Sequence, residues 1–187
     1  MKIWIQEGQY PENGITIKLL WEMARSAIRR LGCAILLAME LTLASIGSPL
    51  AANDPYCELT RRYLKRTSPF AECRDQSFRS EELMFQWIAR RKNRAAPTIV
   101  LLDSRGRTFT SEAFAGWMGT RRDSGAQHLI FGVGSADGWS ENALRQANLQ
   151  LSLGPMTLAH ALAQLVLAEQ IYRAFTILSG HPYHTGH

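Results

Sequence analysis

A glycine-led loop is the first segment of the sequence whose residue types could bind a ligand. Residues 134–138 read Gly-Ser-Ala-Asp-Gly and follow a short apolar run that ends at Val133. Because glycine has no Cβ, its backbone can lie close to a bound molecule. The G-x-G-x-x-G and G-x-x-x-x-G-K-[ST] patterns are both absent, which argues against a dinucleotide or P-loop site. Other ligands stay open, and so does a tight turn without a ligand.

A second glycine loop leads directly into a long apolar stretch. Residues 153–157 read Leu-Gly-Pro-Met-Thr, and the periodicity beyond them predicts a helix from Thr157 to Ser179. Free N–H groups at the start of a helix favour carboxylates and phosphates, although a simply capped helix start fits the sequence as well. His160, one turn into this helix, is expected to be a hydrogen-bonded structural histidine.

The C-terminal tail carries histidines at a spacing that invites a metal-site interpretation. His181, His184 and His187 are three residues apart. However, we expect an extended tail after Pro182, and no carboxylate stands nearby in sequence, so no metal site is predicted. An aromatic and histidine-rich tail suits stacking on an unpaired base.

The elements that position these loops follow a βα pattern. Five short apolar runs of the kind that buried parallel strands show alternate with amphipathic stretches; the predicted strands are residues 40–46, 70–74, 98–103, 128–133 and 149–153. We therefore expect an α/β fold with a mostly parallel sheet and helices on both faces. Ligands of such sheets bind at the carboxyl ends of the strands, which here lead into residues 103–107, 134–139 and 154–157.

Capping residues mark the ends of the helices between the strands. Side chains that can cap a helix start are Asp54 (before Pro55), Ser80, Ser111 and Ser140. Gly180 is predicted to close the last helix in the left-handed conformation.

Composition points to a globular protein in a reducing compartment. The formal net charge is +5 and the sequence pI is about 9.4, which is compatible with a polyanionic partner. The three cysteines, Cys33, Cys57 and Cys73, form no CxxC pair, so neither a disulfide framework nor a zinc knuckle is predicted. These features favour the cytoplasm.

The N-terminal region raises the question of export. Arg29 and Arg30 precede an apolar run, but Glu40 interrupts it, and cleavage near residue 52 would leave Pro49 or Leu50 where a small residue is needed. As a membrane helix, the run would carry a carboxylate near its middle at a cost of about 2 to 3 kcal/mol. A buried strand explains it better. Residues 1–38 are then an extension, disordered or a start-site artefact, beside one domain of residues 39–187.

From Met39 to its C-terminus the chain resembles the RlmH family. The resemblance rests on the segments MELTLASIG, ELTRRYLKR, VLLDSRGR, FGVGSADGW, LSLGPMTLAHALA and EQIYRAFTILSGHPYH. Members are SPOUT-class methyltransferases that modify N3 of a pseudouridine in large-subunit (23S) ribosomal RNA. The resemblance implies a C-terminal deep trefoil knot, S-adenosyl-L-methionine as cofactor, a homodimer, and ribosomal RNA within the assembled ribosome as partner. No membrane association is expected.

The resemblance also assigns site residues. The positions where the family binds its cofactor are Leu101, Leu102, Gly134, Ser135, Gly138, Leu153, Gly154, Pro155, Met156, Thr157 and Leu158. Those where it handles the target nucleotide are Arg173, Tyr183 and His184. The chain departs from the family pattern at Ser135, usually a second glycine, at Gln164, usually an arginine, and at Thr185, usually a basic residue.

In methyl transfer the cofactor supplies the electrophile, and the protein mainly positions the reactants and stabilises charge. The guanidinium of Arg173 could stabilise the charge that the base gains on losing its N3 proton, and His184 is a candidate acceptor of that proton. Competing hypotheses are a non-catalytic RNA-binding SPOUT protein and, more distantly, a secreted metal-binding protein.

Helix geometry favours an active site shared between two chains. His160 and Arg173 are thirteen residues apart on one predicted helix, about 20 Å along its axis at 1.5 Å per residue. A partner helix could pack across an apolar stripe and supply a second Arg173. The stripe consists of Leu158, Leu162, Leu165, Ile171 and Phe175. Alternatively, the stripe packs on its own sheet.

Overall fold

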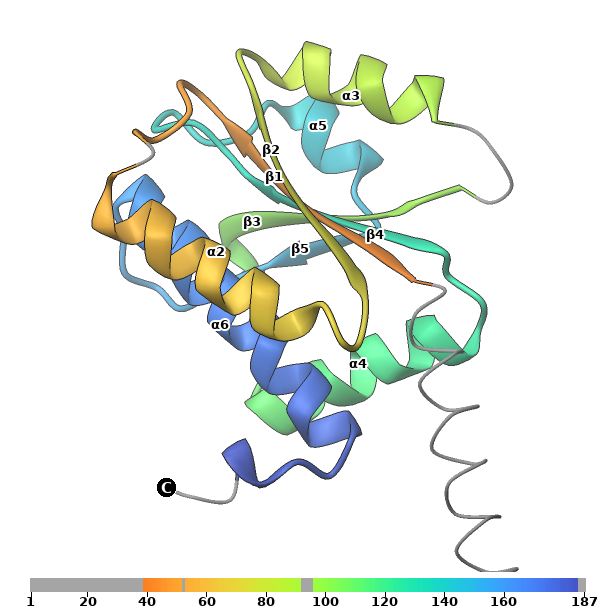
Figure 1. The fold of residues 1–187 in the computed structure, drawn as a ribbon. Helices are drawn as coiled ribbons and strands as arrows, with labels where there is room; N and C mark the ends of the chain where they lie inside the picture. The colour runs from red at the N-terminus through yellow and green to blue at the C-terminus, as the bar shows by residue number, and fades with distance from the viewer. Residues whose placement is uncertain (1–38, 52, 92–95, 185–187) are drawn as a thin grey trace, which may run out of the picture.

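Five parallel strands form a single sheet in the computed structural model, which describes residues 39–51, 53–91 and 96–184 (Figure 1). The strands are β1 (Glu40–Ile46), β2 (Glu72–Phe78), β3 (Thr98–Arg107), β4 (His128–Val133) and β5 (Leu149–Leu151), in the order β2-β1-β4-β3-β5. All four pairings are parallel. The helices are α2 (Pro55–Thr67), α3 (Glu81–Arg90), α4 (Ser111–Asp123), α5 (Glu141–Gln146) and α6 (His160–Leu178), followed by the 3-10 turn η1 (Pro182–His184).

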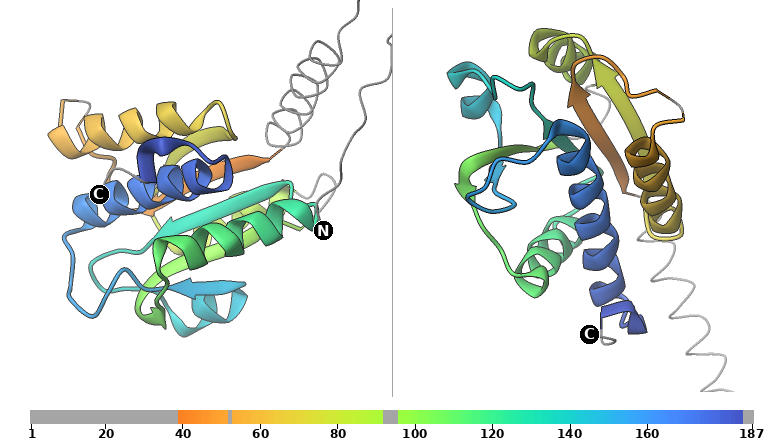
Figure 2. Two further views of the ribbon diagram at one scale, coloured as in Figure 1. Left: turned by 90° about the horizontal axis from the view of Figure 1, so that it is seen from below. Right: turned by 90° about the vertical axis from the view of Figure 1, so that its left-hand side faces the viewer.

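Helices cover both faces of the sheet, which confirms the predicted fold class. In Figure 1, α3 and α5 lie on one face and α2, α4 and α6 on the other. The central strand β4 shows why, because its successive side chains point to opposite faces. Leu129 and Phe131 pack in the cluster under α2, α4 and α6, whereas Ile130 packs in the cluster under α3 and α5. Figure 2 shows α6 lying between α2 and α4.

The predicted strand bounds are confirmed for β1 and β4 and are wrong for β2. The second strand was expected at residues 70–74 but runs from Glu72 to Phe78. Phe70 precedes it and stacks on Phe175 of α6, with 5.8 Å between ring centroids. β2 is an edge strand whose residues are mostly exposed, so no continuous apolar run marks it. β3 is longer than predicted and β5 shorter.

Most helix caps are confirmed, and one is displaced. Asp54 and Ser80 accept hydrogen bonds from backbone N–H groups of the helices that they precede, as does Ser140. The predicted cap Ser111 is wrong because Thr110 occupies that position and accepts from the N–H of Ala113 at 3.2 Å.

The last helix starts later than predicted and ends at Leu178, one residue before the predicted end. α6 begins at His160, whereas the prediction had it begin at Thr157. The chain bends first at Gly154, which has a φ of +132° that suits glycine, and residues 152–159 stay outside any helix. At the other end, Gly180 adopts the left-handed conformation with φ of +65°.

The segment that follows β5 crosses very close to the end of β3. Leu151 pairs first with Leu102 and then with Arg107, so residues 103–106 bow out of the sheet between these two contacts. Ser152 forms hydrogen bonds with this displaced segment. Its N–H donates to the carbonyl of Arg107 at 2.9 Å, and its hydroxyl donates to the carbonyl of Ser104 at 3.1 Å. At Gly106 an added Cβ would lie 2.6 Å from the backbone of Gln150. Only glycine fits at this crossing.

The remaining expectations about the whole chain are not tested by the described residues. The N-terminal extension and Thr185 lie outside them. The trefoil knot stays a prediction. Among residues 39–51, 53–91 and 96–184, no helix is both long enough and apolar enough to cross a membrane.

The close approach of Gly106 to the backbone of Gln150 leads to a prediction about stability. Gly106→Ala should lower the free energy of unfolding by about 1 to 3 kcal/mol or more, because two backbone segments would have to separate. Gly116→Ala is the matched control: this glycine lies on the exposed side of α4 with open space around it, and alanine there should stabilise the helix by up to about 1 kcal/mol. Denaturant unfolding of both variants measures the difference, and equal stability would contradict the crossing.

Candidate functional site

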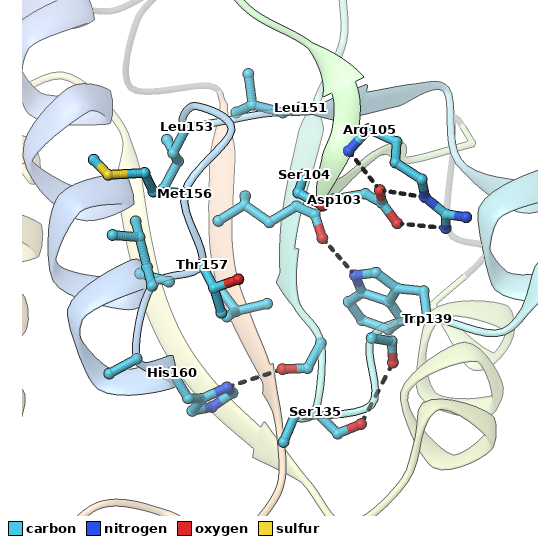
Figure 3. A pocket seen from close by; sticks show the side chains of 18 of the residues that line it. Asp103, Ser104, Arg105, Ser135, Trp139, Leu151, Leu153, Met156, Thr157 and His160 are labelled. Carbon is cyan, nitrogen blue, oxygen red and sulfur yellow. Dashed lines mark hydrogen bonds and ion pairs between the residues drawn. The ribbon is translucent and has the colours of Figure 1, made fainter.

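A pocket of about 640 Å³ lies at the carboxyl ends of β3, β4 and β5 (Figure 3). The three loops expected from the sequence form its walls: the lining includes residues 102–105, 133–139, 153–154 and 156–160. The structure brings together most of the predicted cofactor positions in this lining, namely Leu102, Gly134, Ser135, Gly138, Leu153, Gly154, Met156, Thr157 and Leu158. The predicted positions Leu101 and Pro155 are not part of the lining; Leu101 is fully buried in the core instead.

Trp139 explains why a glycine stands at position 134. The indole is only 7% exposed, and its Nε1–H donates to the carbonyl of Leu102 at 2.9 Å. A Cβ on Gly134 would lie 3.0 Å from that nitrogen, and a Cβ on Gly132 would lie 3.0 Å from the ring. The sequence left open whether a close ligand or a tight turn requires the glycine. In the structure, the indole ring occupies the space that a Cβ of Gly134 would need.

His160 joins the start of α6 to the same loop. Its Nδ1 lies 2.9 Å from the carbonyl oxygen of Gly134. Because a carbonyl only accepts, Nδ1 must carry the proton, and the ring is a structural donor as expected from the sequence. The helix start itself has no side-chain cap: Ala159 occupies the capping position, and both residues line the pocket. Backbone N–H groups are therefore left for a polar or anionic ligand group.

Asp103 and Arg105 form the polar wall of the pocket. The Asp103 side chain is 8% exposed, and Arg105 donates to both of its carboxylate oxygens, each at 3.1 Å. These hydrogen bonds lower the pKa of Asp103, so its carboxylate stays ionised and can accept from ligand hydroxyl groups. The sequence marked this loop but assigned neither side chain a role.

A second polar cluster lies at the opposite end of α6. Arg173 pairs with Glu169 at 2.6 Å, and the hydroxyl of Tyr183 donates to the same carboxylate at 3.2 Å. The Arg173 guanidinium also lies 5.0 Å from the centre of the Tyr183 ring. The hydrogen bond to Glu169 raises the pKa of Arg173, and burial is the main cause of a raised Tyr183 pKa. Glu169 is the residue that the sequence analysis missed, one helical turn before Arg173.

The tail that carries the other predicted nucleotide residues is only partly described. Residues 182–184 form a 3-10 turn, so the extended tail expected after Pro182 is wrong there. The side chain of His184 lies outside the described part of the chain. Within the described residues, no three His, Cys, Asp or Glu side chains are grouped as a metal site would require.

The apolar stripe of α6 divides into two parts. Ile171 and Phe175 are fully buried in the core of their own chain, so they are wrong as residues of a dimer face. They pack in one cluster with the strand residues Leu129 and Phe131, on the face of the sheet where α6 contacts α2 and α4. Leu158, Leu162 and Leu165 are only partly buried. Of the five stripe residues, only these three, around the start of the helix, remain available to a partner.

Comparison with known proteins identifies relatives of the chain. A family model described as a predicted SPOUT methyltransferase matches residues 39–184. The ribosomal RNA large subunit methyltransferase H of Koribacter versatilis is 47% identical over 129 residues, which cover 69% of this chain and 88% of the relative. The protein of the same name from Rhizobium meliloti is 52% identical over 86 residues, 46% of this chain and about half (54%) of the relative's length.

Solved structures are more distant. The SpoU methyltransferase AviRb of Streptomyces viridochromogenes, solved in complex with AdoMet, aligns with a TM-score of 0.44 and 13% identity. The alignment covers 72% of this chain and 57% of AviRb.

The packing of Trp139 on Gly134 predicts a coupling between the two positions. Gly134→Ala should destabilise the protein by about 1 to 3 kcal/mol, because the indole is held by its hydrogen bond and cannot retreat from the new methyl group. In a Trp139→Leu background the same change should cost almost nothing. A double-mutant cycle from denaturant unfolding measures this coupling. Equal costs in both backgrounds would show that Gly134 does not contact the indole.

Proposed function

This chain belongs to the SPOUT methyltransferase family, and we propose that it methylates a base of large-subunit ribosomal RNA with S-adenosylmethionine as the methyl donor. The observation that carries the proposal is the pocket at the carboxyl ends of β3, β4 and β5, which three loops of the chain build together. Its relatives from Koribacter versatilis and Rhizobium meliloti are named as methyltransferases of that RNA.

The lining of the pocket fits S-adenosylmethionine. Apolar side chains, among them Leu102 and Leu153, can pack against a purine, and the ionised Asp103 can accept from ribose hydroxyl groups. The uncapped start of α6 can receive the carboxylate of the methionine part. The cofactor supplies an electrophilic methyl group, so the protein has to hold both reactants in line and keep water out.

The proposed target atom is N3 of a pseudouridine. This nitrogen must lose its proton, and the negative charge then spreads onto the neighbouring carbonyl oxygens. Arg173 would stabilise that charge through paired hydrogen bonds, with Glu169 holding the guanidinium in place. Tyr183 would contact the nucleotide, and His184 would accept the proton.

The length of α6 supports a homodimer with shared active sites. One helix holds His160 at the pocket and Arg173 thirteen residues later, which is about 20 Å along the axis. One chain cannot bring both to the same methyl group. The partly buried Leu162 and Leu165 give α6 an apolar surface on which a second copy can pack, so that each pocket receives Arg173 from its partner.

The setting of the reaction is proposed as the assembled ribosome in the cytoplasm. Four basic side chains are exposed on α2 and can contact RNA phosphates: Arg61, Arg62, Lys65 and Arg66.

We also propose that residues 39–187 are the methyltransferase domain. A chain that starts at Met39 should fold, dimerise and bind the cofactor like the full chain; loss of solubility would assign residues 1–38 to the domain.

Methyl transfer to ribosomes tests the proposed function. The full chain, incubated with isotope-labelled S-adenosylmethionine and ribosomes that lack the modification, should yield N3-methylpseudouridine, identified by mass spectrometry of nucleosides. Arg173→Ala should lower kcat by about 100-fold or more, because a donor to the developing charge is lost. Its affinity for the cofactor, measured by calorimetry, should not change. Ribosome binding without methyl transfer by the unmodified chain would indicate a non-catalytic RNA-binding protein.

Subunit mixing tests the shared site. Thr157→Trp should fill the cofactor pocket, and Arg173→Ala should remove the charge-stabilising group, so each homodimer should be inactive. Heterodimers of the two variants should regain part of the activity, because one of their two sites combines an intact pocket with an intact Arg173. After confirmed exchange of subunits, a mixture without activity would show that each chain builds its site alone.

A further inference from the structure

A second hollow, of about 290 Å³, lies beside the first turns of α6 and has no part in the site described above. It is enclosed by α2, by the end of β2 and by the segment after β1; the lining residues are Pro49, Leu50, Cys57, Thr60, Arg61, Asp75, Gln76, Ser77 and Gln164. Ala163 lines the cofactor pocket, and the next residue, Gln164, lines this hollow. The two cavities therefore flank the same helix at the same edge of the sheet.

One buried group in this hollow has no partner within the described part of the chain. The Thr60 residue is 2% exposed, and its Oγ1 forms no hydrogen bond there. Leaving a buried hydroxyl unpaired lowers the stability of a protein. The other buried threonine near the end of α2 is different, because the hydroxyl of Thr67 donates to the carbonyl of Tyr63 at 2.9 Å. An unpaired buried hydroxyl on a residue that lines a cavity points to a ligand that satisfies it.

The other polar side chains of the hollow indicate what that ligand is. Gln164 is 5% exposed and offers both an amide donor and an amide acceptor. Asp75 adds an acceptor. Desolvation raises the pKa of its carboxyl group, and this effect is larger than the lowering of the pKa by the positive charge of Arg61. This mixture of donors and acceptors suits the edge of a nucleobase better than it suits an anion. The exposed Arg61 at the rim begins the basic surface of α2, on which a phosphate backbone can lie.

We propose that this hollow binds a base of the RNA that neighbours the methylated one, with Thr60 and Gln164 hydrogen-bonded to its edge. The proposal rests on the proposed function and deepens it, because it gives the protein a means of choosing its target by sequence. Proteins read RNA sequence chiefly on unstacked bases that turn into such pockets. A target base at the cofactor pocket and its neighbour in the hollow would then lie on the two sides of α6.

Stability and RNA affinity should change in opposite directions when the hydroxyl of Thr60 is removed. Thr60→Val keeps the shape and deletes an unpaired group, so Tm should rise by roughly 2 to 4 °C. The KM for ribosomes should rise about tenfold, while kcat and the Kd for S-adenosylmethionine stay unchanged. Thr60→Ser keeps the hydroxyl and should keep the KM. Gln164→Leu should raise the KM in the same way.

Thr67→Val is the matched control, because it removes a hydroxyl that is already paired. It should lower Tm and leave the KM for ribosomes unchanged.

The proposal is overturned if Thr60→Val leaves the KM for ribosomes unchanged or lowers Tm as Thr67→Val does. It is also overturned if Thr60→Val weakens the dimer, because the hollow would then belong to a contact between subunits. A KM can be measured only if the unmodified chain methylates ribosomes. A failure of the proposed function is therefore seen in the unmodified chain, before any variant is compared. In that case, ribosome binding by the same variants, measured by co-sedimentation, decides the role of the hollow.

Discussion

The site depends on one close contact, the passage of Ser152 and Gln150 against the bowed end of β3. The hydrogen bonds of Ser152 to Arg107 and Ser104 hold the two segments together, and Gly106 lets their backbones meet. Because β3 bows out there, Asp103 lies in the pocket wall, and because β5 ends there, the chain turns at Gly154 toward α6. This contact therefore positions two of the three loops that line the pocket.

α6 connects this contact to the proposed chemistry. Its first turn is joined to the loop after β4 by His160, its second turn lies between the two cavities, and its C-terminal half holds Arg173 against Glu169. Since a helix of this length is rigid, the pocket and the guanidinium are held apart within one chain. A two-fold partner is the simplest way to reunite them. Ile171 and Phe175 pack in the core of their own chain, whereas Leu162 and Leu165 near the start of the helix are only partly buried and can contact that partner.

The sequence predicted the architecture well because the relevant signals are local. Continuous apolar runs marked β1 and β4, and Asp54, Ser80 and Ser140 marked helix starts. It misplaced β2, since an edge strand needs no apolar run, and it started α6 too early, since the turn at Gly154 depends on the crossing with β3. Of the pocket, it predicted the loops but neither the role of Trp139 nor that of Asp103. Those roles arise from contacts between segments that are distant in sequence, such as the bond from Trp139 to Leu102.

The most direct test of the central claim is a crystal structure of the protein grown with S-adenosylmethionine. We expect density for the cofactor in the pocket between Leu102, the loop 134–138 and the loop 153–158, with its carboxylate near the start of α6 and its ribose near Asp103. We further expect a two-fold partner whose Arg173 approaches the sulfonium methyl group. Cofactor bound elsewhere on the chain, or a pocket that stays empty at saturating cofactor concentration, would contradict the assignment of this pocket as the methyl-donor site.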